Sequence, residues 1–138
     1  MRYLGLDLGS RTLGVSISDA SGMIASSYKT IPHKEEYNRL VEEVGKLIEE
    51  KKVDKIVLGF PKNMDNSIGE KGKLSMRFKE KLENRYHIEV ILQDERLTTR
   101  QAESVLIQGD TSRKKRKKVI DSLAATIILQ SYLDRKGR

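Results

Sequence analysis

The stretch from residue 2 to residue 18 constrains the fold more than any other part of the sequence. Apolar residues are dense from Tyr3 to Leu8 and then alternate with small or polar residues from Leu13 to Ile17, which predicts a buried strand followed by a half-buried one. Residues 9–12, Gly-Ser-Arg-Thr, are typical of a turn, so the two strands are predicted to form an antiparallel hairpin. Asp7 lies near the end of the first strand, where a buried carboxylate is costly unless it is paired or binds a metal. A carboxylate at this position therefore indicates a functional site.

The rest of the sequence alternates between strand and helix patterns. Further strands are predicted over residues 23–31, 54–60 and 88–93, and helices over residues 33–52, 70–86, 98–108 and about 117–133. A hairpin followed by alternating helices and strands is typical of a sheet that is extended by parallel strands. We therefore expect an α/β fold in a single domain over residues 1–138. Its five-stranded mixed sheet joins antiparallel hairpin strands to parallel strands and carries helices on both faces.

Composition narrows the classes of protein and of partner. The chain has 27 Lys and Arg against 20 Asp and Glu, a net charge of +7, which favours a polyanion over an acidic protein as the partner. The absence of Cys excludes disulfides, thiolate metal sites and cysteine nucleophiles, and it fits a reducing cytoplasm. The sequence shows neither a signal peptide nor an apolar run long enough to span a bilayer. We expect a cytoplasmic protein that binds nucleic acid and not a membrane.

Three acidic residues are candidates for one site. Asp7 lies on the first strand, Glu95 just after the last strand, and Asp121 in the last helix. The carboxyl ends of parallel strands meet at one edge of an α/β sheet, where ligands bind, so Asp7 and Glu95 are expected to lie close together. Asp121 shares a helical face with Ala124 and Ala125, and small residues on that face favour close packing on the sheet.

Three carboxylates without a Lys or His among them indicate a metal site. Such groups repel one another unless a cation neutralises them, and oxygen ligands suit Mg²⁺ or Mn²⁺ better than Zn²⁺. One or two such ions would support phosphodiester hydrolysis. Taken singly, each acid also has an ordinary explanation: Asp7 can cap a turn, and Glu95 can pair with Arg96. Asp121 can be a half-exposed helix residue. Their joint placement favours the metal site.

Four short motifs are distinctive: Leu-Asp-Leu-Gly at 6–9, the Gly-x-Pro loop at 59–61, Asp-Glu-Arg-Leu-Thr-Thr at 94–99 and Asp-x-x-Ala-Ala at 121–125. They resemble the motifs of the RuvX family, also called YqgF. Together they extend from the first strand to the last helix, and Asp-Glu-Arg-Leu-Thr-Thr is the most specific. The resemblance implies a ribonuclease H-like fold related to Holliday-junction resolvases, and a nuclease that processes the 5′ end of pre-16S ribosomal RNA. It makes Asp7, Glu95 and Asp121 the metal-binding catalytic acids.

Basic and loop residues are expected to contact the substrate. Residues 113–118 are six consecutive cations that begin the last helix, where the helix dipole opposes positive charge, so a phosphate backbone explains them better than stability does. The loop at 59–63 adds backbone amides and a lysine beside the acids, although a plain turn would look similar. The residues predicted to bind the substrate are Gly9, Arg11, Pro61, Lys62, Asn63, Arg96, Thr98, Arg113, Lys114, Lys115 and Arg116. Two lone histidines, His33 and His87, receive no role.

Alternative functions belong to other classes. A DNA resolvase needs the same acids, but resolvases of this superfamily usually present a fourth carboxylate one helical turn from the last, where this chain has Lys118 and Ala124. Asp94 is expected to point away from Glu95 because neighbouring strand residues face opposite sides. A catalytically silent RNA- or ribosome-binding module would keep the fold without using the acids. An ATP-binding protein of the sugar-kinase type would need two such halves. RNA is the preferred partner, DNA remains an alternative, and the oligomeric state stays open.

Overall fold

The computed structural model describes residues 1–61, 68–94 and 113–136, with side chains in the last range described from Leu123 onward. Its strands are β1 (Tyr3–Leu8), β2 (Thr12–Ser18), β3 (Ala25–Pro32), β4 (Lys55–Phe60) and β5 (Glu89–Asp94). Its helices are α1 (Tyr37–Lys51), α2 (Glu70–Tyr86) and α4 (Arg113–Lys136). The helix predicted over residues 98–108 lies outside the described residues.

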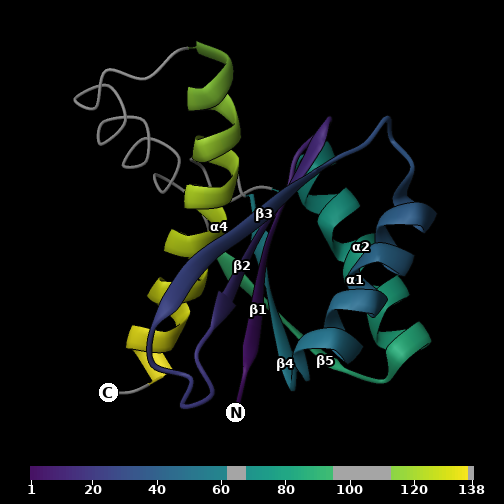
Figure 1. Cartoon of the computed structure of the whole chain (residues 1–138). Helices are drawn as coiled ribbons and strands as arrows, with labels where there is room; N and C mark the ends of the chain where they lie inside the picture. The colour runs from purple at the N-terminus through teal and green to yellow at the C-terminus, as the bar shows by residue number, and fades with distance from the viewer. Residues whose placement is uncertain (62–67, 95–112, 137–138) are drawn as a thin grey trace.

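The five strands form one mixed sheet in the order β3-β2-β1-β4-β5. β2 pairs antiparallel with both β1 and β3, whereas β4 pairs parallel with both β1 and β5. β1 is central because the hairpin turn brings β2 to one side of it and the connection through α1 brings β4 to the other (Figure 1). This confirms the predicted five-stranded mixed sheet of antiparallel hairpin strands and parallel strands.

Helices cover both faces of the sheet, as predicted (Figure 1). α1 and α2 pack on one face, over a core that includes Leu4 and Leu6 of β1. α4 packs on the other face, where Tyr3 and Val57 are buried with Ile128 of the helix. Because successive side chains of a strand point to opposite faces, the odd-numbered residues of β1 and β4 face α4. Among the described helices, none combines the length and the apolar character needed to cross a membrane.

Small residues let α4 lie close against the sheet. Ala124 and Ala125 are buried, which confirms the predicted inner face of this helix. On β1, a Cβ added at Gly5 would lie 2.8 Å from Leu129 Cβ and 3.0 Å from the Ala125 carbonyl oxygen. Ser16 Oγ on β2 donates a buried hydrogen bond of 2.8 Å to that same carbonyl. The helix backbone is therefore held in contact with the two central hairpin strands.

Two helix starts differ from the predictions. The first helix begins at Tyr37 and not at His33, because Pro32 ends β3 and Glu35 has a left-handed φ of 59°, which a helix cannot contain. The last helix is already helical at Arg113, about four residues before the predicted start near 117. Lys and Arg are good helix formers, and the basic run at 113–118 is part of α4.

The start of β3 and the start of the loop after β4 also differ from the predictions. β3 begins at Ala25 and not at Met23, because the Asp19 carboxylate accepts hydrogen bonds from the backbone N–H groups of Met23 (3.0 Å) and Ile24 (3.1 Å) and holds both residues in the turn. Gly59 and Phe60 were assigned both to the strand over residues 54–60 and to the loop at 59–63. They are the last two residues of β4, paired with β5, which confirms the end of the strand. The loop after β4 therefore starts at Pro61.

Candidate functional site

Asp7 occupies the second-last position of β1, at the carboxyl end of the central strand. Its side chain is half-buried, and strand alternation puts it on the α4 face together with Tyr3 and Gly5. The partner position on β2 is Gly14, which adds no side chain beside the carboxylate. The carboxylate thus lies where open α/β sheets bind ligands, on a face that a helix covers.

The register between β1 and α4 locates the helical turn opposite Asp7. The rings of Tyr3 and Tyr132 are in contact, with centroids 5.7 Å apart, whereas Gly5 lies against Ala125 and Leu129. Each step toward the carboxyl end of β1 therefore corresponds to a step toward the N-terminal end of α4.

Two strand residues cover about 6.6 Å and one helical turn about 5.4 Å, so the turn of α4 opposite Asp7 is the one that precedes Ala125. Asp121 occupies that turn of the helix backbone, although its side chain lies outside the described residues. Figure 1 shows the N-terminal part of α4 at the same end of the molecule as the β1–β2 turn.

β4 and β5 extend the α4 face of the sheet beyond Asp7, on the side away from β2. β4 is in register with β1 through Leu6 and Leu58, so Gly59 lies next to Asp7, on the face to which Val57 also belongs. Gly59 is paired in turn with Gln93 of β5. Gln93 is only 9% exposed, and its Oε1 has no hydrogen-bond partner. Sequence reasoning missed Gln93, whose only signal is a polar residue inside a buried strand.

The β1–β2 turn, which contains Gly9 and Arg11, is closed by short backbone hydrogen bonds. Gly9 N donates to the Thr12 carbonyl at 2.8 Å, and His33 N donates to the Arg11 carbonyl at 2.8 Å. The His33 ring adds a third contact, with Nε2 2.9 Å from the Gly9 carbonyl oxygen. The turn beside Asp7 is therefore held by the segment that follows β3.

His33 was assigned no role from the sequence, and the structure makes it the support of this turn. Its ring is buried and lies against Tyr37, with centroids 5.6 Å apart. Nδ1 accepts a hydrogen bond of 3.0 Å from the Glu35 backbone N–H. The ring proton is therefore on Nε2, which donates a hydrogen bond to the Gly9 carbonyl oxygen. The neutral imidazole satisfies both contacts.

Replacing the imidazole should loosen the turn. We expect His33→Ala to lower the free energy of unfolding by about 2 kcal/mol, since it leaves a cavity and removes two hydrogen bonds. Urea denaturation followed by circular dichroism measures this change. The control is His87→Asn, because His87 is exposed and caps α2 in a left-handed conformation that Asn also adopts. Equal stabilities of the two variants would refute the supporting role of His33.

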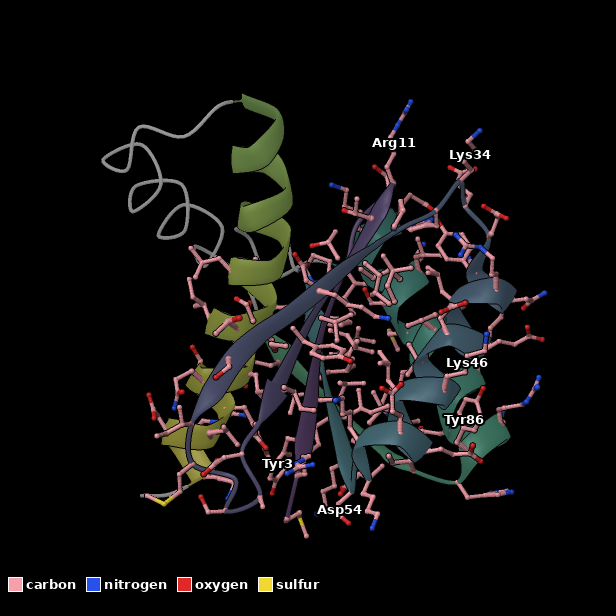
Figure 2. The ribbon with its side chains drawn as sticks, viewed as in Figure 1. Tyr3, Arg11, Lys34, Lys46, Asp54 and Tyr86 are labelled. Carbon is pink, nitrogen blue, oxygen red and sulfur yellow. The ribbon has the colours of Figure 1, made fainter. Side chains whose placement is uncertain are left out.

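A hollow of about 490 Å³ opens beside the turn, lined by Ser10, Arg11, His33, Lys34 and Glu35. Arg11 and Lys34 are exposed and extend from this end of the molecule, as Figure 2 shows. Their positive charge lies at the end of the sheet where β1 carries Asp7. This geometry agrees with the predicted contact between Arg11 and a phosphate, which stays a prediction.

Other predicted site residues are only partly described. Pro61 directly follows β4, and its carbonyl lies against Gly72 at the start of α2. The predicted substrate-binding residues 113–116 lie in the first turn of α4, without described side chains. Lys62, Asn63, Glu95, Arg96 and Thr98 lie outside the described residues.

Asp7 and Asp94, the two candidate acids whose side chains the structure describes, lie on opposite faces of the sheet. Asp94, the last residue of β5, has the strand parity of Val90, which packs on the α1 and α2 face, so it lies on the face opposite Asp7. Asp94 therefore supplies no fourth carboxylate beside Asp7. Within residues 1–61, 68–94 and 123–136, no group of three His, Asp or Glu side chains is placed to hold a metal ion. The predicted triad requires Glu95 and Asp121, whose side chains are outside these ranges.

Solved structures establish the fold class. RuvC from Thermus thermophilus, solved in complex with a Holliday-junction substrate, aligns with a TM-score of 0.63 at 14% identity, over 99% of this chain and 96% of that one. This likeness confirms the ribonuclease H-like fold. A ROK hexokinase from the same organism aligns with a TM-score of 0.50 at 24% identity, over 75% of this chain but 38% of the hexokinase. The two folds are therefore related, while this chain matches only a part of the kinase.

Sequence comparisons identify the family. A protein of Bacillus subtilis named "Putative pre-16S rRNA nuclease" is 52% identical over 135 residues, which cover 97% of this chain and 98% of that protein. A protein of the same name from Enterococcus faecalis is 51% identical, and the alignment covers all of both chains. The family model described as "RuvX: Holliday junction resolvase" matches residues 1–135. The chain belongs to the RuvX family, as its motifs predicted.

Proposed function

We propose that this chain is a cytoplasmic, divalent-metal-dependent nuclease, a single domain that processes the 5′ end of pre-16S ribosomal RNA. Membership of the RuvX family and near full-length identity to relatives named for this activity support a hydrolase of phosphodiester bonds. One observation carries the proposal. Asp7 lies at the carboxyl end of β1, on the α4 face, opposite the helical turn that contains Asp121.

The described residues around Asp7 suit a hard divalent cation. They offer a half-buried carboxylate and, on the same face, the buried Gln93 oxygen that lacks a partner, with only glycines at the positions that flank Asp7. Mg²⁺ and Mn²⁺ prefer oxygen ligands of this kind. We assign Asp7, Glu95 and Asp121 as the residues that hold one or two ions. When bound, such ions activate water and stabilise the leaving oxygen in phosphodiester hydrolysis.

Positive charge around this end of the sheet supports a nucleic-acid substrate. Arg11 is exposed in the turn after β1, and the basic run at 113–116 begins the described part of α4, whose N-terminal end lies at the same end of the molecule (Figure 1). We propose that these cations neutralise phosphates of the substrate on either side of the cleaved bond. The remaining proposed contacts are Gly9, Pro61, Lys62, Asn63, Arg96 and Thr98.

Two alternative functions, a junction resolvase and a silent RNA-binding module, are to be distinguished from this proposal by experiment. The Holliday-junction complex of RuvC and the wording of the family description favour a junction resolvase as the second candidate. The silent RNA-binding module would share the basic surface but not the use of Asp7. The ATP-binding alternative is dropped, because the chain matches only 38% of the hexokinase but matches the Bacillus subtilis relative over 98% of its length.

The proposal is tested by comparing two labelled substrates. One is a 16S precursor that carries its 5′ leader, and the other is a four-way DNA junction, each incubated with Mg²⁺, with Mn²⁺ or with EDTA. We expect metal-dependent shortening of the precursor at its 5′ end, none in EDTA, and little incision of the junction. Paired, symmetrical cuts in the junction alone would favour the resolvase. Binding of RNA without cleavage of either substrate would favour the silent module.

A further inference from the structure

Gln93 presents an unusual polar atom on the sheet face that α4 covers. Among the described residues, only Arg2 Nε and Gln93 Oε1 are buried side-chain polar atoms without a hydrogen-bond partner. Arg2 lies at the amino end of β1, where its Nη1 donates to the Lys51 carbonyl, far from Asp7 along the strand. Gln93 lies at the carboxyl end of β5, in the same register row as Asp7. An unpaired buried oxygen is costly, so it requires an explanation.

The orientation of Gln93 follows from strand alternation. Val90 and Leu92 of β5 pack with the core under α1 and α2, so Ile91 and Gln93 point to the α4 face. Gln93 is paired with Gly59, and Gly59 lies beside Asp7 on the other side. The Asp7 and Gln93 side chains therefore project from the same face, with a glycine between them.

The spacing of these two side chains matches an intervening hydrated ion. Neighbouring strands lie about 4.8 Å apart, so the Cα atoms of Asp7 and Gln93 are separated by roughly 10 Å across β4. This separation is too long for a direct hydrogen bond between side chains that project in parallel, and Gly59 contributes nothing to fill it. A carboxamide oxygen at this place is suited to accept a hydrogen bond from water in the hydration shell of a cation.

We propose that Gln93 is a positioning residue of the metal site: its Oε1 accepts a hydrogen bond from a hydration water of the divalent ion held by Asp7. This inference rests on the proposed function, because it requires the metal site. It adds Gln93 to the metal site as a residue that acts in addition to Asp7, Glu95 and Asp121. The oxygen stays unpaired in the metal-free protein and gains its partner when the ion binds.

The test compares Gln93→Leu with Gln130→Leu by Mn²⁺ titration and by thermal unfolding without metal. Gln130 is the matched control because its carboxamide is fully engaged: Oε1 accepts from Ala25 N at 2.8 Å, and Nε2 donates to the Met23 carbonyl at 3.0 Å. We expect Gln93→Leu to weaken Mn²⁺ binding about tenfold or more. It should also raise the Tm of the metal-free protein by a few degrees, since an unpaired buried polar group is removed. Gln130→Leu should lower the Tm and leave Mn²⁺ affinity unchanged.

Each other outcome is decisive. If Gln93→Leu lowers the Tm and leaves Mn²⁺ affinity within twofold of the wild type, Gln93 is structural and the inference is wrong, while the proposed function stands. If the wild type itself binds no Mn²⁺, the metal site fails, and both the inference and the proposed function fail with it. Gln93→Glu provides a second variant if the leucine variant does not fold, and its added negative charge should tighten Mn²⁺ binding.

Discussion

Asp7→Asn is expected to reduce cleavage of the 16S precursor by about a thousandfold or more, while the protein still folds and still binds RNA. Asn has nearly the shape of Asp, so the half-buried position at the end of β1 keeps its packing. The change removes the charge that would attract the divalent ion, and the ion contributes several kcal/mol to stabilising the transition state. Single-turnover cleavage with excess protein measures the loss without a contribution from product release.

The stability of this variant separates catalysis from folding. The three acids that we propose to converge would repel one another without a cation, so removing one charge should leave the Tm of the metal-free protein within a few degrees of the wild type. We propose that RNA binding depends on the cations, so its affinity should stay within twofold at a fixed salt concentration.

The matched control for Asp7→Asn is Asp54→Asn. Asp54 is an exposed aspartate that accepts a hydrogen bond of 2.8 Å from Arg2 N, at the opposite end of the sheet from Arg11 (Figure 2). It should retain full cleavage. If cleavage survives Asp7→Asn in protein purified to the same degree, the activity does not belong to this site.

Much of the fold was predictable because its signals are local. Alternation over residues 13–17 and the apolar run at 3–8 predicted the hairpin, and apolar residues four positions apart, Leu74, Phe78 and Leu82, predicted α2 with its observed bounds. The small residues Ala124 and Ala125 predicted which face of the last helix packs on the sheet, and both are buried. Periodicity was sufficient for these elements because burial repeats along each of them.

Other features depend on contacts between distant residues. His33 and Gly9 are 24 positions apart, and a single histidine after a proline has no periodic pattern that would connect it with a turn. Gln93 became noticeable only through the register of β4 and β5, which puts it in the same row as Asp7. The start of α4 was predicted about four residues too late, although the Lys and Arg residues of the run at 113–118 are good helix formers.

The convergence of the three acids stays a prediction, and its support differs from residue to residue. For Asp7, strand position, burial and face all agree with the expected site. For Asp121, the helix register provides the backbone position only. For Glu95, the support is its place in the sequence immediately after β5.

The packing of α4 on β1 leads to the second large effect, which Gly5→Ala should produce. An added Cβ would overlap Ser16 Oγ and would lie 2.8 Å from Leu129 Cβ and 3.0 Å from the Ala125 carbonyl oxygen. Two of these neighbours belong to the body of the helix, so α4 must move outward. We expect the free energy of unfolding to fall by about 3 kcal/mol, through overpacking and the loss of the Ser16 hydrogen bond. Urea denaturation measures the change.

Control variants distinguish strain on the α4 face from general destabilisation. A Cβ at Gly45 would overlap the hydroxyl and two ring atoms of Tyr86, on the sheet face opposite α4, where the hydroxyl donates a hydrogen bond to the Val41 carbonyl. Gly45→Ala should therefore also lower the stability, but it should leave the cleavage rate of the folded protein unchanged. A double variant, Gly5→Ala with Ser16→Ala, removes the nearest overlap. Its loss of unfolding free energy should therefore be smaller than the sum of the losses in the two single variants.

The activity of Gly5→Ala connects the packing to the proposed chemistry. Residue 121 lies one helical turn from Ala125, so an outward shift of α4 at Ala125 also carries Asp121 away from Asp7. We expect cleavage by the folded fraction to fall at least tenfold at a temperature where this variant remains folded, because catalytic groups tolerate little displacement. Full activity in a folded but destabilised Gly5→Ala protein would mean that α4 does not carry a catalytic residue.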